Sequence, residues 1–163
     1  MHIDPQARGW VGVVSHAHVR RGVAGGFAQL CHGKHGPLAR MERGDYLIYY
    51  SPSTEFGGGE PLRAFTAIGR VVGDAPYLFD MGGGFVPYRR DVAYFDAQLV
   101  TLASLRASLE FTQGSWGMLA RRGHFPIGLD DVRRIASAMR VKDTTGSSRS
   151  VRPLRSCTAD APG

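Results

Sequence analysis

Polar side chains follow the first hydrophobic segment of the chain, at a point where they are able to meet a ligand. Val11, Val13 and Val14 form a β-branched run that predicts a short buried strand. Ser15 ends this run, and its hydroxyl group is able either to cap the first turn of a following helix or to hydrogen-bond a ligand. The local pattern leaves both roles open.

The helix predicted after Ser15 is short. Gly22 is a poor helix former, and the pair Gly25-Gly26 favours a helix end with positive φ. Phe27 follows this pair directly. The strand end, the helix N-terminus and the Gly-Gly-Phe segment therefore lie close together, and we expect a pocket there.

Histidine and cysteine side chains in the same region raise the question of a metal site. They are His16, His18, Cys31, His32 and His35. Their spacing matches none of the common zinc-binding patterns. We therefore predict no metal and no other cofactor, and we interpret these histidines as pocket lining or surface.

Motifs of the common catalytic classes are absent from the sequence. No glycine-rich loop precedes a Lys-Ser or Lys-Thr pair, and no Gly-x-Ser-x-Gly segment occurs. The one close carboxylate pair, Asp130 and Asp131, fits the positive N-terminal end of a predicted helix. The sequence predicts no catalytic residue.

Aromatic and arginine side chains near the expected pocket have the chemistry of a nucleic-acid site. An aromatic ring is able to stack on a base, and we expect one of Tyr49 and Tyr50 to do so while the other packs in the core. Phe85, after a triple-glycine loop, is a further candidate. Two arginine pairs are able to grip phosphates, although such pairs are also common on solvated faces: Arg20, Arg21, Arg89 and Arg90.

These residues must be held by a mainly β framework. We expect strands over residues 10–14, 27–30, 46–51, 62–72, 77–79, 85–95 and 125–127, and helices after residue 15 and over residues 103–109, 116–120 and 129–139. We expect flexible or polar loops over residues 31–37 and 52–61. Short glycine turns between strands, with no βαβ rhythm, favour a small barrel or a strongly curled sheet, and the fold class is α+β.

Composition and charge limit the function classes. The chain has 163 residues, of which 43% are hydrophobic and 21% charged, as in a single globular domain. The formal net charge is +6, which favours a polyanionic partner. Residues 1–139 and residues 140–163 each carry +3, so half of the excess lies near the C-terminus.

The remaining compositional signals concern the compartment. No window of about eighteen apolar residues occurs, and residues 1–6 lack the features of a signal peptide, so we expect a soluble, cytoplasmic protein that is not in a membrane. Cys31 and Cys157 are far apart in sequence, and we expect both to be reduced.

The ordered series of motifs resembles the EVE-domain proteins of bacteria, which belong to the PUA-like superfamily beside the YTH and ASCH domains. The series consists of residues 10–15, the Gly25-Gly26-Phe27 segment, Gly44-Asp45 with Tyr49-Tyr50-Ser51, and residues 65–69, 85–92 and 122–125. The resemblance covers about residues 9–139. Each motif alone is weak, and their order is what makes the series specific.

The resemblance implies a PUA-like β pseudo-barrel with flanking helices that binds nucleic acid, with modified bases as ligands. In related YTH readers an aromatic cage holds a methylated base beside the first strand end and the segment after the first helix. By motif position, Ser15 and His16 fall at that strand end, and Phe27 falls where those readers place a cage tryptophan. Because phenylalanine offers less stacking area, the methyladenine preference of YTH readers does not carry over.

We therefore predict a DNA- or RNA-binding domain that accepts a flipped base. The predicted base pocket consists of Ser15, His16, Gly26, Phe27, Tyr49, Tyr50, Ser51 and Phe85, and the predicted phosphate rim consists of Arg20, Arg21, Arg89 and Arg90. Two alternatives stay open, an enzyme that acts on a nucleobase or nucleotide in the same cleft and a peptide-binding module. We expect a short N-terminal extension (residues 1–8), the EVE domain (residues 9–141) and a disordered basic tail (residues 142–163).

Overall fold

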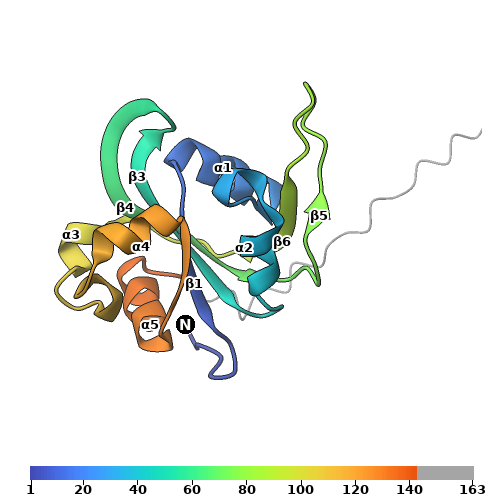
Figure 1. Ribbon diagram of the computed structural model, residues 1–163. Coiled ribbons are helices and arrows are strands. Elements are labelled where there is room, and N and C mark those ends of the chain that lie inside the picture. Colours follow the sequence, from blue (N-terminus) through green and yellow to red (C-terminus); the bar gives the residue numbers. More distant parts are fainter. Residues whose placement is uncertain (143–163) are drawn as a thin grey trace, which may run out of the picture.

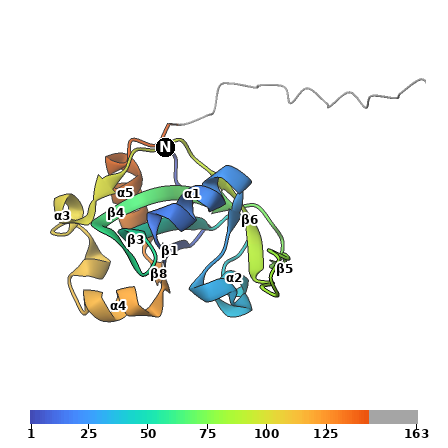
Figure 2. The same cartoon turned by 90° about the horizontal axis from the view of Figure 1, so that it is seen from above.

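The computed structural model describes residues 1–142 and has a curled sheet with helices on both sides. Figure 1 shows α3, α4 and α5 on one side of the molecule, and α1, α2 and the β5–β6 hairpin on the other. Figure 2, turned by 90°, shows the same separation. The α+β class and the curled sheet predicted from the sequence are confirmed. The tail predicted over residues 142–163 lies outside the described residues except for Lys142.

The sheet is mixed and follows the order β2-β6-β4-β3-β1-β8, with β5 paired to β6 and β7 paired to β4. Its strands are β1 (Gly9–Val13), β2 (Phe27–Ala28), β3 (Tyr46–Glu55), β4 (Gly58–Val71), β5 (Tyr77–Leu78), β6 (Tyr88–Tyr94), β7 (Val100–Thr101) and β8 (His124–Ile127). β1 and β3 are parallel, and every other pair is antiparallel. The sequence shows no βαβ rhythm, but the connection from β1 to β3 is a parallel crossover that contains α1, β2 and α2.

Five α-helices and two short 3₁₀ turns connect the strands within residues 1–142. The helices are α1 (His16–Gly25), α2 (His35–Arg40), α3 (Leu102–Leu105), α4 (Trp116–Arg122) and α5 (Leu129–Ala138), and the turns are Cys31–Gly33 and Glu110–Thr112. α2 occupies part of the segment predicted as a polar loop. No helix among these residues is long and apolar enough to cross a membrane.

The middle of the sheet is buried on both faces because β3 contributes to two hydrophobic clusters. Tyr46, Ile48 and Tyr50 pack with α5 on one face. Leu47 and Tyr49 alternate with them and pack with α1 and α2 on the other face. This alternation follows from the two-residue period of a strand and explains why residues 46–50 are apolar without interruption.

The β3–β4 hairpin corrects one prediction from the sequence. Residues 52–61 were expected to form a flexible loop, but the ladder continues through Ser53↔Pro61 to Glu55↔Gly58. Phe56 and Gly57 form the turn, and Gly57 has φ of 70°. The Thr54 hydroxyl accepts the Glu60 N–H at 3.0 Å, which ties the two strands together near the tip. The hairpin therefore stands beyond the core as an ordered element.

The N-terminal residues pack on the domain. Ile3 is buried in the cluster around α5. The Asp4 N–H donates to the Tyr46 hydroxyl at 3.0 Å, and the Asp4 carboxylate lies 3.2 Å from the Arg70 guanidinium. The predicted boundaries at residues 8 and 141 stay predictions.

Candidate functional site

A cavity of about 420 Å³ lies beside the N-terminal end of α1, where the sequence predicts a pocket. This volume lies within the range of about 300–1,000 Å³ that is typical of small-ligand sites. The cavity is lined by Val13, Val14, Ser15, His18, Arg21, Gln29, Cys31, His32, Phe56, Met81 and Phe85. Three of the twelve predicted site residues, Ser15, Arg21 and Phe85, therefore line one cavity.

Ser15 has both roles that the sequence left open. It is the N-cap of α1, and its hydroxyl oxygen accepts the His18 N–H at 3.4 Å. The same side chain lines the cavity. Because this capping hydrogen bond is long, the hydroxyl keeps capacity for a ligand.

His18 and Gln29 form a polar pair in the cavity wall. The His18 Nε2 atom lies 2.8 Å from the main-chain carbonyl oxygen of Gln29. A carbonyl oxygen only accepts, so Nε2 carries the proton. Burial lowers the pKa of His18, which keeps the ring neutral at pH 7 and leaves Nδ1 as an acceptor.

The apolar walls come from two hairpins. Phe56 lies at the tip of the β3–β4 hairpin and is 83% exposed, while Met81 and Phe85 lie in the segment between β5 and β6 and are 41% and 47% exposed. The Phe56 ring meets the His32 ring edge-on at 5.8 Å. Of these three residues only Phe85 was predicted from the sequence. Phe56 and Met81 also lie directly beside triple-glycine segments, and this is the signal that could have identified them.

The turn Cys31–Gly33 closes one side of the cavity with an uncommon backbone. Cys31 and His32 have φ of 48° and 60°, in the left-handed region that non-glycine residues rarely adopt, and Gly33 has φ of 79°. Such residues persist only where the surrounding structure holds them, and they cluster at functional sites. Burial raises the pKa of the Cys31 thiol, so the thiolate needed for nucleophilic chemistry is disfavoured.

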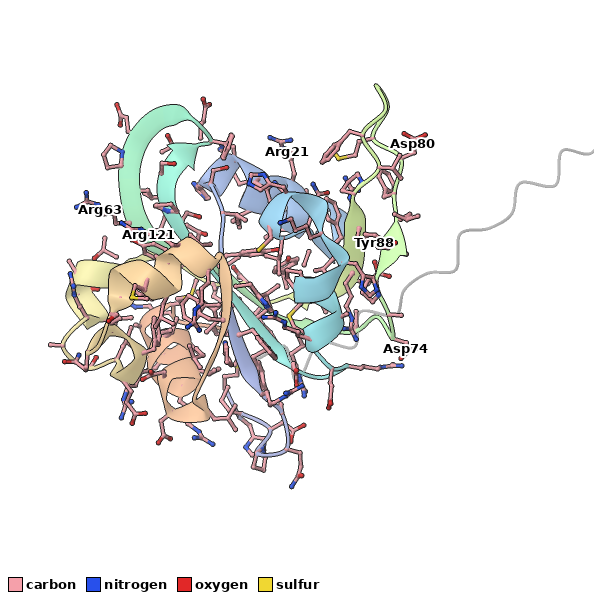
Figure 3. The ribbon with its side chains drawn as sticks, viewed as in Figure 1. Arg21, Arg63, Asp74, Asp80, Tyr88 and Arg121 are labelled. Carbon is pink, nitrogen blue, oxygen red and sulfur yellow. The ribbon has the colours of Figure 1, made fainter. Side chains whose placement is uncertain are left out.

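Arginine side chains from α1 supply positive charge beside the cavity. Arg21 lines it, and Figure 3 shows this residue between the two hairpins. Arg20, its neighbour in α1, is exposed. Neither guanidinium forms an ion pair with any residue in the part of the chain that the structure describes. Both stay available for an anionic ligand.

Phe27 and Arg89 contact each other and do not line the cavity, which corrects two predicted roles. The Arg89 guanidinium carbon lies 3.8 Å from the centroid of the Phe27 ring and 3.8 Å from that of the Phe79 ring. Arg89 is only 8% exposed, and its Nε–H donates to the Gln29 side-chain oxygen at 3.2 Å. The predicted base-stacking ring thus stacks on an arginine, and the predicted phosphate contact is enclosed.

Arg90, which was predicted to contact phosphate, is also buried. It is 3% exposed, and its guanidinium donates to main-chain carbonyl oxygens of Leu38, Met41, Gly73 and Asp74. The Arg90 side chain therefore joins the C-terminal end of α2 to the turn before β5. It has no surface on which to meet a phosphate.

Neither tyrosine faces the cavity. Tyr49 is 1% exposed and shares a 3.4 Å hydrogen bond with the Tyr94 hydroxyl, and burial raises its pKa to about 12. Tyr50 packs edge-on against Trp116 in the other cluster, with ring centroids 5.0 Å apart. Ser51 is fully buried and hydrogen-bonded to Thr66 at 2.8 Å. All three are core residues because β3 is covered on both faces.

Two further predicted residues, one at each end of α1, do not line the cavity. His16 begins α1 and is partly buried, which lowers its pKa. Gly26 caps α1 with φ of 71°, and its carbonyl oxygen accepts the Val92 N–H at 2.9 Å. That carbonyl is therefore already used by β6.

No group of three or more His, Cys, Asp or Glu side chains within residues 1–142 is arranged to hold a metal ion. The absence of a metal site nevertheless stays a prediction. A second cavity, of about 400 Å³, lies between the N-terminus and α5 and contains none of the predicted residues.

Comparisons with known proteins identify relatives of this chain. The sequence profile of the EVE domain matches residues 8–138. The UPF0310 protein YdcG of Bacillus subtilis is 49% identical over 134 residues, which cover 81% of this chain and 92% of that protein.

Two solved structures have the same fold at low sequence identity. The YTH domain of the Zygosaccharomyces rouxii MRB1 protein, in complex with N6-methyladenosine RNA, has a TM-score of 0.60 at 14% identity and covers 91% of this chain and 94% of that chain. The Pho92 YTH domain, in complex with m6A, has a TM-score of 0.57 at 17% identity and covers 88% and 90%. The PUA-like fold predicted from the sequence is confirmed.

Proposed function

Because this chain belongs to the EVE domain family and has the fold of YTH domains, we propose that it binds nucleic acid and accepts one extruded base in the cavity beside Ser15. The observation that carries the proposal is the cavity itself, which combines two apolar walls with a polar side and a free arginine. The two YTH domains were solved with methyladenosine RNA or m6A, which supports a base as the ligand.

In the proposed complex the base stacks between the two hairpins. Phe56 and Phe85 offer ring faces, and each base–aromatic stack contributes about 1–3 kcal/mol. Phe27, whose ring contacts Arg89 and does not line the cavity, has no part in this stack. A base reaches such a cavity only when it is unstacked, so single-stranded or locally opened nucleic acid is the expected partner.

The flanking phosphates are assigned to the α1 side of the cavity. Arg20 and Arg21 are exposed and free of ion pairs within the described residues. The β3–β4 hairpin tip carries Glu55 and Glu60, which repel phosphates. The sugar–phosphate backbone of the bound nucleic acid is therefore expected to pass over α1, and only the base is expected to contact the hairpin tip.

A modified base is favoured because the cavity walls are apolar. An added methyl group that is buried against Met81 and Phe85 contributes about 0.8 kcal/mol, or about fourfold in affinity. A stronger preference requires a penalty for the unmodified base. We propose a reader rather than an enzyme, since the residues that line the cavity include no carboxylate, and burial raises the pKa of the one thiol among them, Cys31.

The test is a titration of short single-stranded DNA and RNA oligonucleotides that carry a modified, an unmodified or an abasic position. Affinity should fall as salt rises and should be higher for oligonucleotides with a base than for their abasic counterparts. Equal affinity for base-containing and abasic strands would contradict the base cavity. An affinity that does not change with salt would contradict the phosphate contacts, and no binding of any oligonucleotide would favour the peptide-binding alternative.

A substitution at the tip of the β3–β4 hairpin tests whether the base stacks there. Phe56→Ala should weaken base-dependent binding by about 1–3 kcal/mol without lowering stability, because its side chain is 83% exposed. Met118→Ala, at a 62% exposed position on α4, is the matched control and should bind like the parent. Unchanged binding of Phe56→Ala would remove the β3–β4 hairpin from the site.

A further inference from the structure

The side-chain amide of Gln29 has a fixed orientation. Gln29 follows β2, is 6% exposed and lines the cavity. One of its two terminal atoms lies 3.2 Å from Arg89 Nε. An arginine Nε–H only donates, so this terminal atom must be the oxygen. The amide nitrogen is therefore the atom turned away from Arg89.

Arg89 is itself held firmly enough to impose this orientation. Its guanidinium lies between the rings of Phe27 and Phe79, with 3.8 Å from the guanidinium carbon to each ring centroid. Phe27 belongs to β2 and Phe79 to the segment that follows β5, so the arginine joins the body of the domain to the hairpin. Cation–π contacts on both faces restrict the guanidinium in a partly desolvated place.

Both acceptors of Gln29 are used by the protein, whereas its side-chain donors are free. The Oε1 atom accepts from Arg89, and the main-chain oxygen accepts from His18 Nε2. The Gln29 Nε2 group donates to no atom of residues 1–142. It is not fully buried either, because the only buried side-chain polar atoms without a partner in that part of the chain are the two ring nitrogens of His124.

We infer that Gln29 reads the edge of the ligand by donating its side-chain N–H groups to an acceptor of the base, a carbonyl oxygen or an unprotonated ring nitrogen. This inference rests on the proposed function. Gln29 is the residue that determines which edge of the base enters, and Arg89 is a positioning residue that acts through it. Bases that present a donor at this point are rejected, because two donors would face each other in a confined site.

A purely structural role for Gln29 makes a different prediction. Buried amides are usually hydrogen-bonded through both ends, and a structural glutamine would use its nitrogen as well as its oxygen within the protein. Here the nitrogen is left for water or for a ligand in a cavity. The role is therefore testable by removing the donors and keeping the oxygen.

Gln29→Glu makes that change with little change of shape. A glutamate keeps an oxygen for Arg89 Nε, with which it forms an ion pair, and replaces the N–H donors by an acceptor. Gln98→Glu serves as the control because it adds the same charge at an exposed position. There the main-chain N–H, which the substitution keeps, donates to the Met139 carbonyl oxygen. Each protein is titrated with one base-containing and one matched abasic oligonucleotide, because the added charge affects both strands and the lost donors affect only the first.

The expected result is a loss of about tenfold or more in the preference of Gln29→Glu for the base-containing strand, with the preference of Gln98→Glu unchanged. If folded Gln29→Glu keeps the parent's preference, the inference is wrong and the proposed function survives. If the parent itself shows no preference for the base, the proposed function fails together with the inference.

Arg89→Met separates positioning from phosphate binding. Methionine fills the space between the two rings but leaves the Gln29 amide free to turn, so the base preference should fall while the salt slope stays as in the parent. In the double variant with Gln29→Glu, the loss of preference should be no larger than in Gln29→Glu alone. A salt slope reduced by about one unit with unchanged base preference would instead make Arg89 a phosphate contact and would overturn its assigned role.

Discussion

Arg90 is a buried cation whose hydrogen-bond partners are all main-chain carbonyl oxygens, from residues 38, 41, 73 and 74. Arg90→Met keeps most of the apolar volume and leaves these oxygens without their donor. We expect the free energy of unfolding to fall by about 3 kcal/mol, as for other broken buried charge networks. Urea denaturation measures the change.

Arg20, another arginine of the predicted phosphate rim, supplies the control for Arg90. Arg20→Met removes an exposed arginine of α1 and should leave stability within about 0.5 kcal/mol of the parent. It should reduce the salt slope of nucleic-acid binding, whereas folded Arg90→Met should keep that slope. A stable Arg90→Met protein would show that the carbonyl oxygens are solvated without it.

His124 is a buried histidine without a hydrogen-bond partner among the described residues. It is 3% exposed and stacks on the Trp10 indole, with ring centroids 4.8 Å apart and planes at 6°. Burial, helped by the charge of Arg40, lowers the pKa of His124 from the usual 6.5 to about 4. The buried ring is therefore neutral and favours the folded state only while it stays so.

The direction of the pH dependence follows from this lowered pKa. Between pH 6.5 and about 4 the unfolded state binds a proton that the folded state does not, so the contribution is complete above pH 6.5 and is lost as pH falls towards 4. At about 1.4 kcal/mol per pH unit the loss is about 3 kcal/mol. His124→Phe keeps an aromatic ring on Trp10, and its stability relative to the parent should rise by this amount on acidification. Parallel acid profiles of the two proteins would contradict the assignment.

A pocket beside Ser15 was predicted from the sequence, and a cavity lies there, but several side chains predicted to line it lie elsewhere. The reason is geometric. Ser15, Arg21 and Phe85 follow from local patterns, a strand end, a helix face and a glycine-rich turn. The role of Gln29 depends on Arg89, sixty positions later in the chain. No local pattern reports which of two adjacent arginines is enclosed between rings and which is enclosed among carbonyl groups.

At the level of elements, the turn Cys31–Gly33 determines where the β5–β6 hairpin stands. Gly33 has φ of 79°, and a Cβ atom there would lie 2.3 Å from the Cβ atom of Pro87, at the base of β6. Gly33→Ala must therefore strain the turn and push the hairpin root away. We expect a loss of about 2 kcal/mol in unfolding free energy and weaker base binding, because Met81 and Phe85 move with the hairpin.

Gly36 offers a matched control three residues later. It lies within α2, and a Cβ atom there would meet nothing within 4 Å. Gly36→Ala should change the free energy of unfolding by no more than about 1 kcal/mol, because the gain of alanine in a helix is offset by the following Pro37. Both variants are measured by urea denaturation and by titration with the same oligonucleotide. Equal stability of the two variants would show that the hairpin adjusts freely.

Most elements were predictable because their signals are local. The β-branched run of β1, the aromatic run of β3 and the amphipathic face of α5 each specify one structure. The β3–β4 hairpin was missed because its strands hold each other through cross-strand pairing beyond Ser51, where Pro52 and three glycines suggest a loop. The parallel pairing of β1 with β3 is likewise a property of the whole crossover.

At the scale of the molecule, positive charge is unevenly compensated. Residues 1–142 contain 17 basic and 12 acidic residues, a net charge of +5. Ion pairs neutralise several arginines, such as Arg43 with Asp74 and Arg133 with Asp130. Arg21, Arg63 and Arg121, which Figure 3 shows on α1, β4 and α4, have no acidic partner among the described residues. These arginines give residues 1–142 a positive electrostatic potential that attracts a polyanion without the C-terminal residues.

The C-terminal residues should therefore be dispensable for base recognition. Residues 143–163 contain three arginines and two aspartates, a net charge of +1, and their sequence lacks an apolar period. A chain that ends at Lys142 should keep the thermal midpoint of the parent and the same preference for base-containing over abasic strands. Its affinity for all strands should fall by a common factor, because only phosphate contacts are removed.

A 163-residue chain with Arg149, Arg152 and Arg155 replaced by serine tests whether the charge of these residues, and not the segment itself, supplies this affinity. It should show the same uniform loss of affinity as the shortened chain, and a salt slope lower by at most about three units. A drop of about 10 °C or more in the midpoint of the shortened chain alone would show that these residues pack on the domain, since about 1 kcal/mol shifts such a midpoint by only a few degrees. A change in base preference in either protein would extend the recognition site beyond residue 142.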